Sequence, residues 1–282
     1  MAVLLGLAVA ATYGTGDFFG GLAAKRTTTW SVTVVVQAVG LVALLVLVPL
    51  DGVAMPAGRD LLLGAIASFA GTAGVGFLYL GLARGPMGVV APITAVGAAV
   101  LPVAWGLLQG ERPSTLAMVG VVLALVAVAF IARHPPEHGD DEPATAATST
   151  LVMAVASGLC FGTFFVLISH TDDGSGFWPL LSGRAASVPL LVVVLALAGQ
   201  QIVPARTSLA SAALAGFFDV AANSLLILAV REGLLALVSP VASLYPATTV
   251  LLARLVLDER LHRLQVGGLA VALAGVTLIA TG

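Results

Sequence analysis

Three ionisable side chains stand inside stretches of sequence that are otherwise apolar: Asp17, Arg184 and Asp219. An ionisable group in a membrane-spanning helix costs about 2.5–3.5 kcal/mol on insertion scales, so it usually pairs, faces a cavity or has a function. Asp17 or Asp219 could take up a proton, and Arg184 could attract a substrate carboxylate. The alternative is structural: Arg184 forms a fixed ion pair with one aspartate, or its head group reaches the membrane surface.

Neutral polar and aromatic residues of the same stretches could line the same cavity. Asn223 follows Asp219 by four residues, so both lie on one face of a helix. The alternative for each residue is a hydrogen bond to a backbone carbonyl or to a neighbouring helix. The further candidates for substrate binding are Tyr79, Thr94, Trp105, Gln109, Ser182 and Tyr245.

The composition indicates which kind of element must hold these residues. Of the 282 residues, 59% are hydrophobic and only 9% are charged, whereas a soluble domain carries about 25% charged residues. So few charges cannot cover a water-exposed surface, which excludes a water-soluble enzyme. Lys and Arg (12) are balanced by Asp and Glu (14) without a basic patch, which argues against nucleic-acid binding. The composition predicts an all-α integral membrane protein.

Ten stretches are apolar enough and long enough to cross a bilayer, which takes about 20 residues. Short connections between them predict antiparallel neighbours. The segment 134–149 differs, because it is acidic and contains prolines, and it reads as a linker near the middle of the chain. The predicted spans are 2–22, 29–50, 60–83, 86–108, 113–133, 150–169, 177–199, 207–229, 234–256 and 262–281.

The two sides of this linker align with each other without a gap at an offset of 148 residues. Trp30 falls on Trp178, and Glu111-Arg112 falls on Glu259-Arg260; between residues 78 and 132 there are 16 identities in 55 positions. Matched Trp, Pro, Glu and Arg residues at one offset indicate a duplication. The predicted domains are therefore a first five-helix repeat (1–133), the linker (134–149) and a second repeat (150–282).

The odd number of spans in each repeat has a geometric consequence. The second repeat must enter the membrane from the opposite side, so we expect two inverted halves with a substrate site between them near the midplane. Proline bends helices, and one proline inside the predicted spans matches between the halves, Pro92 with Pro240. We expect bent helices at the pathway, although packing alone would also explain them; the prolines concerned are Pro92, Pro102, Pro240 and Pro246.

Two stretches resemble the EamA branch of the drug/metabolite transporter superfamily. They are Gly85–Ala132 and Gly233–Ala280, in which a Gly- and Pro-containing span is followed by a Glu-containing turn and a Gly-rich span. The resemblance implies a secondary carrier that exports amino acids or other metabolites. Family members often carry an Arg early in the second span of each repeat. Arg184 occupies that place in the second half, but Val36 and Gln37 stand there in the first half.

The remaining motifs limit the function classes. The chain lacks a GxxxxGK[ST] sequence for ATP and an HExxH zinc motif, so we expect no cofactor, no metal and no enzyme activity. We expect alternating access for a small-molecule substrate, with protons as a possible second ligand. A channel that uses the same polar residues is the main alternative, and a membrane scaffold without transport is a third.

The resemblance implies a cell-membrane protein, in bacteria the cytoplasmic membrane, with both termini in the cytoplasm. The Lys/Arg rule disagrees, because seven basic residues fall in the odd-numbered connections and three in the even-numbered ones. The seven are Lys25, Arg26, Arg84, Arg133, Arg206, Arg260 and Arg263, and the three are Arg59, Arg112 and Arg231.

Overall fold

A computed structural model describes residues 1–85, 87–132, 144–257 and 263–281. These residues form α-helices and one short 3-10 helix, and they contain no strand. The helices are α1 (Ala2–Ala24), α2 (Thr29–Asp51), α3 (Gly58–Arg84), α4 (Met87–Leu108), α5 (Thr115–Ala132), α6 (Ala144–Ser169), η1 (Asp173–Ser175), α7 (Trp178–Leu197), α8 (Arg206–Glu232), α9 (Leu235–Ala242), α10 (Tyr245–Leu257) and α11 (Arg263–Thr281).

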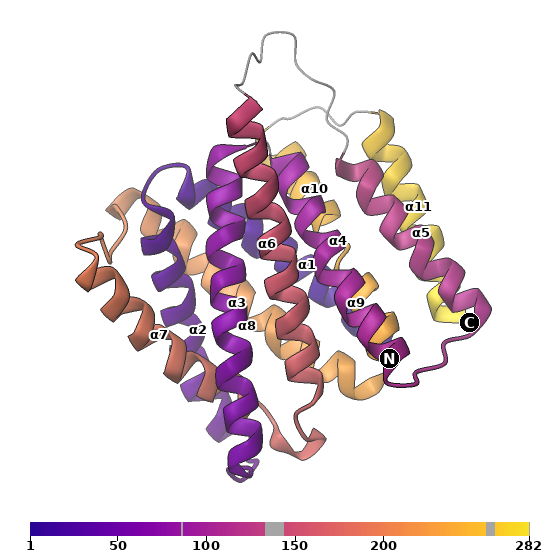
Figure 1. Cartoon of the computed structure of the whole chain (residues 1–282), viewed down its shortest axis with the longest axis horizontal. Helices are drawn as coiled ribbons and strands as arrows, with labels where there is room; N and C mark the ends of the chain where they lie inside the picture. The colour runs from indigo at the N-terminus through magenta and orange to yellow at the C-terminus, as the bar shows by residue number, and fades with distance from the viewer. Residues whose placement is uncertain (86, 133–143, 258–262, 282) are drawn as a thin grey trace.

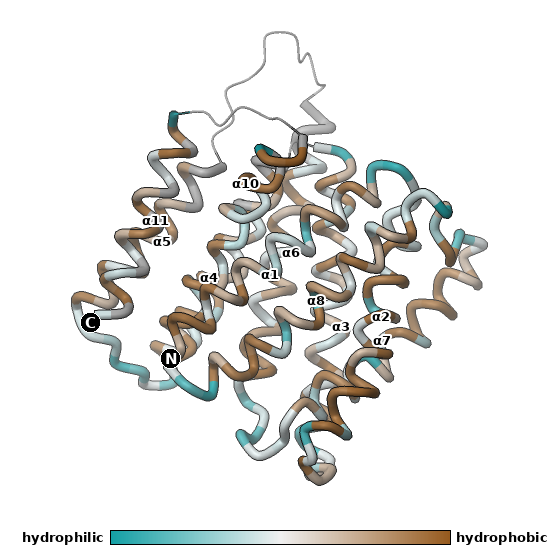
Figure 2. Tube along the Cα trace, turned by 180° about the vertical axis from the view of Figure 1, so that it is seen from behind, coloured by the Kyte–Doolittle hydropathy of each residue, from teal (hydrophilic) through white to brown (hydrophobic). Residues whose placement is uncertain are grey.

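The helices have the apolar surface of a membrane protein. Within the described residues, seven helical stretches are long and apolar enough to cross a membrane by length and composition, and one of them is the combined stretch Leu235–Val256. Shorter apolar helices cover Ile93–Leu108, Thr115–Ala127 and Val266–Ile279. Figure 2 shows hydrophobic residues along the helices and hydrophilic ones mainly at the connections. The count of ten spans stays a prediction.

The helix ends agree with the predicted spans to within a few residues, with two exceptions. First, α6 begins at Ala144 rather than at residue 150, so the last part of the predicted linker is helical; residues 134–143 of that linker lie outside the described residues. Second, the predicted span 234–256 is two helices, α9 and α10, separated at Ser243 and Leu244.

Pro246 explains where the ninth span breaks. A continuous helix would need the N–H of residue 246 to bond the carbonyl of Ala242, which is the last residue of α9, and proline has no N–H. The corresponding residue of the first half, at the offset of 148, is Ala98, and α4 runs through it without interruption. The two halves therefore differ in shape at this point.

Helices of the first half pack mainly on helices of the second half. The most extensive contacts join α1 to α8, α5 to α11, α3 to α6, and α4 to α6. In Figure 1, α5 and α11 lie side by side at one edge of the molecule, and α3 and α6 lie next to each other at its front. The core is therefore formed by helices of both halves packed against each other.

Glycines allow the closest of these approaches, and they occur at corresponding positions. A Cβ on Gly14 of α1 would overlap the backbone of Tyr245 in α10, and a Cβ on Gly162 of α6 would lie 3.2 Å from the carbonyl oxygen of Gly97 in α4. Gly14 matches Gly162 and Tyr245 matches Gly97 at the offset of 148. The contact of α1 with α10 thus repeats as the contact of α6 with α4.

A second set of glycines joins α5 to α11. A Cβ on Gly120 would lie 2.8 Å from Ile279 N, and one on Gly275 would lie 2.9 Å from Ala124 N. Gly120 and Ala124, two small residues four positions apart, therefore lie in a close helix–helix contact. On α11 the small residue that meets Gly120 and Ala124 is Gly275.

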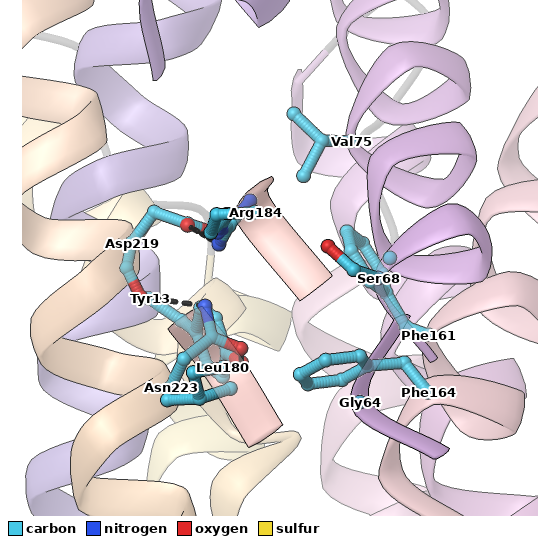
Figure 3. Close-up of a pocket in the computed structure, with 11 residues that line it drawn as sticks. Tyr13, Gly64, Ser68, Val75, Phe161, Phe164, Leu180, Arg184, Asp219 and Asn223 are labelled. Atoms are coloured by element: carbon cyan, nitrogen blue, oxygen red, sulfur yellow. Dashed lines mark hydrogen bonds and ion pairs between the residues drawn. The ribbon is translucent and has the colours of Figure 1, made fainter. Parts of the chain in front are cut away.

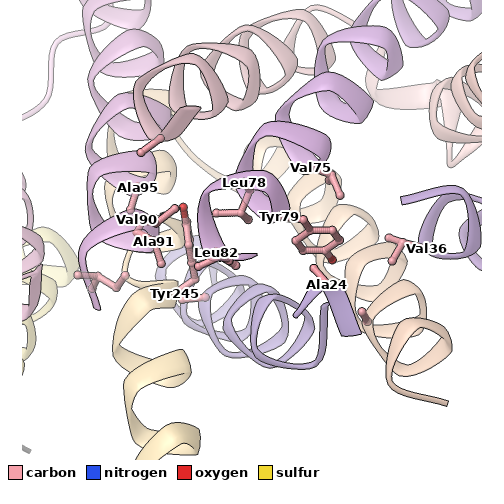
Figure 4. Packing of buried hydrophobic residues seen from close by; sticks show 14 of the residues in the cluster. Ala24, Val36, Val75, Leu78, Tyr79, Leu82, Val90, Ala91, Ala95 and Tyr245 are labelled. Atoms are coloured by element: carbon pink, nitrogen blue, oxygen red, sulfur yellow. Dashed lines mark hydrogen bonds between the residues drawn. The ribbon is translucent and has the colours of Figure 1, made fainter. Parts of the chain in front are cut away.

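Buried aliphatic and aromatic side chains of α3, α4 and α10 form one cluster with residues of α1. Figure 4 shows Leu78, Tyr79 and Leu82 of α3 facing Val90 and neighbouring residues of α4. Tyr79 is 2% exposed and its ring lies directly on Gly20 of α1, where a Cβ would overlap it. This cluster fixes α1, which carries Tyr13 and Asp17, against α3.

Candidate functional site

Arg184 of α7 and Asp219 of α8 form a buried ion pair. The Arg184 guanidinium donates a hydrogen bond to Asp219 Oδ2, and the two side chains are only 8% and 11% exposed. Gly40 of α2 packs next to the arginine, where a Cβ would lie in van der Waals contact, 3.4 Å from Arg184 Nε. The sequence analysis left open whether these two charges pair, and the structure brings them together (Figure 3).

The ion pair continues into a hydrogen-bonded chain that reaches α1. Asn223, one turn after Asp219, donates its side-chain N–H to the Asp219 backbone carbonyl at 2.7 Å. Tyr13 of α1 donates its hydroxyl hydrogen to Asn223 Oδ1 at 2.9 Å. One face of α8 therefore presents Asp219 and Asn223 together, as the spacing of four predicts, and Tyr13 fixes the orientation of the amide.

A cavity that is partly open to the outside lies beside this chain. Figure 3 shows Arg184, Asp219, Asn223 and Tyr13 on one side and the apolar side chains Val75, Phe161 and Phe164 on the other. The wall thus combines α1, α7 and α8 with α3 and α6. The residues that line it are Tyr13, Gly64, Ser68, Gly71, Val75, Phe161, Phe164, Leu180, Arg184, Asp219 and Asn223.

A second cavity has four wall residues in common with the first. Asp17, Tyr79 and Tyr245 line this second cavity, and the carboxylate of Asp17 has no hydrogen-bond or ion-pair partner among the described residues. The Tyr13 ring stands 6.3 Å from the rings of both Tyr245 and Phe165. The common wall residues are Tyr13, Val75, Phe161 and Asp219.

Four of the predicted binding residues line neither cavity. Thr94 donates its hydroxyl to the Ala154 carbonyl at 3.1 Å, and Ser182 donates to the Leu61 carbonyl at 2.9 Å. Trp105 donates its ring N–H to His170 Nε2 at 3.4 Å, and Gln109 lies within hydrogen-bond distance of the same nitrogen. These side chains form hydrogen bonds to a neighbouring helix or to the α6–α7 connection. This is the structural alternative that the sequence left open.

Three of the prolines that were expected at the pathway line neither cavity. Pro102 is buried and packs near Gly162, and Pro240 and Pro246 are buried in α9 and α10. The side chain of Pro92 lies outside the described residues. A proline changes the course of a helix at a distance from its own ring, so the ring itself need not face the cavity.

Tyr13, Ser68 and the phenylalanines of α6 are wall residues that the sequence analysis missed. Tyr13 precedes Asp17 by four residues in the same predicted span, so the spacing already placed it on the face of Asp17. The phenylalanines offered no such signal, because apolar residues of a lipid-facing surface and of a cavity wall look alike in a sequence.

The ion pair has no counterpart in the first half. At the offset of 148, Arg184 corresponds to Val36, which is fully buried, and Asp219 corresponds to Gly71, against which the Phe164 ring packs. Gln37, next to Val36, donates instead to the Thr72 hydroxyl. The charged part of the cavity therefore belongs to the second half. Among the described residues, no group of three or more His, Cys, Asp or Glu residues could hold a metal ion.

Comparison with known proteins identifies the family. The sequence profile of the EamA-like transporter family matches residues 1–133 and 148–281. An uncharacterized protein of Methanocaldococcus jannaschii is 28% identical over 132 residues, which are 46% of this chain and 95% of that protein. A protein of known crystal structure is 15% identical to this chain. The two structures align over 99% of this chain and 96% of that chain with a TM-score of 0.69, which shows a common fold. The chain is an integral membrane protein and belongs to the EamA-like transporter family of the drug/metabolite transporter superfamily.

Proposed function

We propose that the protein is a secondary transporter that exports a small organic metabolite or drug by alternating access between two inverted halves. The observation that carries this proposal is the cavity beside the Arg184–Asp219 pair, because its wall is built from helices of both halves. A site of this kind can open to either side when one half moves relative to the other. Each half contributes five of the predicted spans.

The packing of the helices supports the inverted arrangement. Gly120 contacts Ile279 and Ala124 contacts Gly275, so α5 and α11 run in opposite directions although they correspond in the alignment. Exchange of the two halves also turns the contact of α1 with α8 into that of α6 with α3. These relations support a two-fold axis in the membrane plane as the relation between the two halves.

The ion pair suggests how a proton and a substrate would be linked. In this conformation the Arg184 guanidinium is neutralised by Asp219, so a substrate carboxylate would have to compete with Asp219 for it. Protonation of Asp219 would remove that competition and free Arg184 to bind an anionic group. We therefore propose that Asp219 is the proton acceptor and Arg184 the substrate-binding cation, with Asn223 and Tyr13 holding Asp219 in place.

Transport against pH tests these roles. A growth screen of expressing cells against toxic amino acids, their analogues and antibiotics would first identify an exported compound. For that compound, the Asp219→Asn variant should still bind the compound at Arg184. Its transport rate, however, should no longer depend on pH. Asp173→Asn, which changes an exposed carboxylate outside the cavity, is the control. An unchanged pH profile at a normal rate would remove Asp219 from any proton role.

Counterflow in proteoliposomes separates a carrier from a channel. Unlabelled compound on the inside should drive transient accumulation of labelled compound, because a carrier exchanges the two through one alternating site. A channel gives no such accumulation. A scaffold without transport would tolerate simultaneous replacement of Arg184 and Asp219, whereas we expect this double variant to be inactive.

A further inference from the structure

Two carboxylates of the first half accept hydrogen bonds from backbone N–H groups of the second half. Glu111, in the connection between α4 and α5, accepts from Leu235 N at 3.2 Å and from Ala236 N at 2.9 Å. These are the first two residues of α9, where N–H groups are unpaired and the helix dipole favours a negative charge. Glu111 therefore fastens the start of α9 to the end of α4.

The first half is shaped to hold this carboxylate. Gly110 has φ +92°, a turn conformation that favours glycine, and a Cβ on Gly106 would lie 2.8 Å from Glu111 Cδ. The sequence carries Arg254 and Asp258 at the corresponding positions of the second half, before Glu259. The Glu-Arg pair therefore occurs in both halves, but the residues before it differ. The two glycines that leave space for the carboxylate belong to the first half.

Asp60 makes the second of these contacts, in the first turn of α3. It is 4% exposed and accepts from Asp172 N at 3.3 Å and from the hydroxyl of Ser175. Arg231, at the end of α8, donates to the carbonyls of Asp172 and Gly176 at 3.3 and 3.1 Å. The connection between α6 and α7 is therefore held between the start of α3 and the end of α8.

Both contacts lie at the same end of the bundle, which we call the Asp60 end. It carries the α4–α5 and α6–α7 connections, which Figure 1 shows at the bottom of the molecule. The opposite end, the Ser208 end, carries the start of α8. Ser208 corresponds to Asp60 at the offset of 148, and its buried hydroxyl has no hydrogen-bond partner among the described residues. A carboxylate contact is thus replaced there by a hydroxyl without a partner.

We propose that Asp60 and Glu111 form a latch that keeps the Asp60 end closed in this conformation and that opens during transport. The inference rests on the proposed alternating-access function. Neither residue lines a cavity, so both are positioning residues. Each acts on the cavity through a short helical segment, because Asp60 stands one turn before the wall residue Gly64, and α9 leads into α10 and the wall residue Tyr245.

Accessibility of a cavity cysteine tests the latch without knowledge of the substrate. We would place Ser68→Cys or Val75→Cys in a Cys160→Ala chain and measure its labelling by a membrane-impermeant maleimide in sealed vesicles of either orientation. Met55→Cys and Gln201→Cys, in exposed connections of the two ends, identify which end faces outward. With the latch intact, the reporter should be labelled mainly from the Ser208 end.

Asp60→Asn combined with Glu111→Gln should raise the labelling rate from the Asp60 end about tenfold, since several charge-assisted hydrogen bonds are lost. Glu232→Gln, an exposed carboxylate at the same end, should leave the rate unchanged. Glu111→Asp should restore part of the closure, which a merely structural defect would not show. Asp60→Ser combined with Ser208→Asp should shift labelling away from the Ser208 end.

The outcomes separate the latch from the function on which it rests. Unchanged labelling from the Asp60 end in the double variant, together with continued counterflow, would overturn the latch and leave the transport proposal intact. A reporter that stays unlabelled from both ends in every variant, with no counterflow, would overturn both. If the double variant does not fold, the exchange of Asp60 and Ser208 decides the question alone.

Discussion

Arg184 and Asp219 carry opposite charges at a place where few water molecules can solvate either one. Removal of one partner of such a pair leaves an uncompensated buried charge, at a cost of about 3–5 kcal/mol, whereas replacement of both by apolar residues is often nearly neutral. We expect Arg184→Met and Asp219→Leu each to lower the thermal unfolding temperature in detergent, and the double variant to recover most of the loss. Strictly additive losses would contradict a direct pair. Transport should be absent in the double variant.

Gly20 and Tyr79 form a contact that no larger residue at position 20 allows. A Cβ on Gly20 would overlap the Tyr79 ring, which is buried by α1 and the side chains around it. We expect Gly20→Ala to destabilise the protein by about 1–3 kcal/mol, the usual cost of overpacking. Gly267→Ala in α11 is the matched control, because no atom lies within 4 Å of a Cβ there; it should be neutral or stabilising in the same melting experiment.

At the level of single residues, the sequence identifies the charged and polar side chains inside apolar spans. It does not predict which of these side chains contact one another. Asp219 and Asn223 share a face because helix periodicity alone places them there. The pairing of Asp219 with Arg184 depends on how α7 and α8 both pack on α2, and local sequence does not contain that information. Thr94 and Ser182 illustrate the converse, since a hydroxyl inside a span bonds a nearby carbonyl as readily as it lines a cavity.

The split between α9 and α10 is the main feature at the level of elements that the sequence prediction did not contain. Composition and apolar length predict a continuous span over 234–256, and the prolines predict a bend. The break itself depends on the Ala242 carbonyl, which receives no N–H from Pro246. The other helices were predictable because about 20 apolar residues between polar connections have few alternatives to a helix in lipid.

Pro246→Ala tests whether this break serves transport. The substitution restores the N–H that a helix continuing from α9 into α10 would need, so we expect α9 and α10 to merge and the protein to melt at a higher temperature. Because Tyr245 lies at the break and lines a cavity, the transport rate should fall. Pro49→Ala in α2, an exposed proline inside a helix, should raise stability and leave transport unchanged. Equal transport in both variants would show that the break has only a packing role.

At the level of the whole molecule, the helices pack more extensively between the two halves than within either half. The contacts of α1 with α8, α3 with α6 and α5 with α11 cross between the halves, whereas neighbouring helices of one half, such as α1 and α2, touch much less. A five-helix half on its own would expose the small residues that make these close contacts, Gly14 and Gly120 among them, and the packing energy of its helices would be largely lost.

We therefore expect the halves to fold together and not separately. Residues 1–143 and 144–282, expressed as two chains in the same membrane, should copurify as a one-to-one complex with a single cooperative melting transition. Each chain expressed alone should aggregate or be degraded, because the surfaces that bury Gly14 and Gly120 belong to the other half. Gly120→Leu provides a control for specificity, since a larger side chain at the α5–α11 contact should weaken copurification of the two chains. A first half that is monodisperse and stable by itself would contradict this dependence, and with it the view that the cavity exists only where the two halves meet.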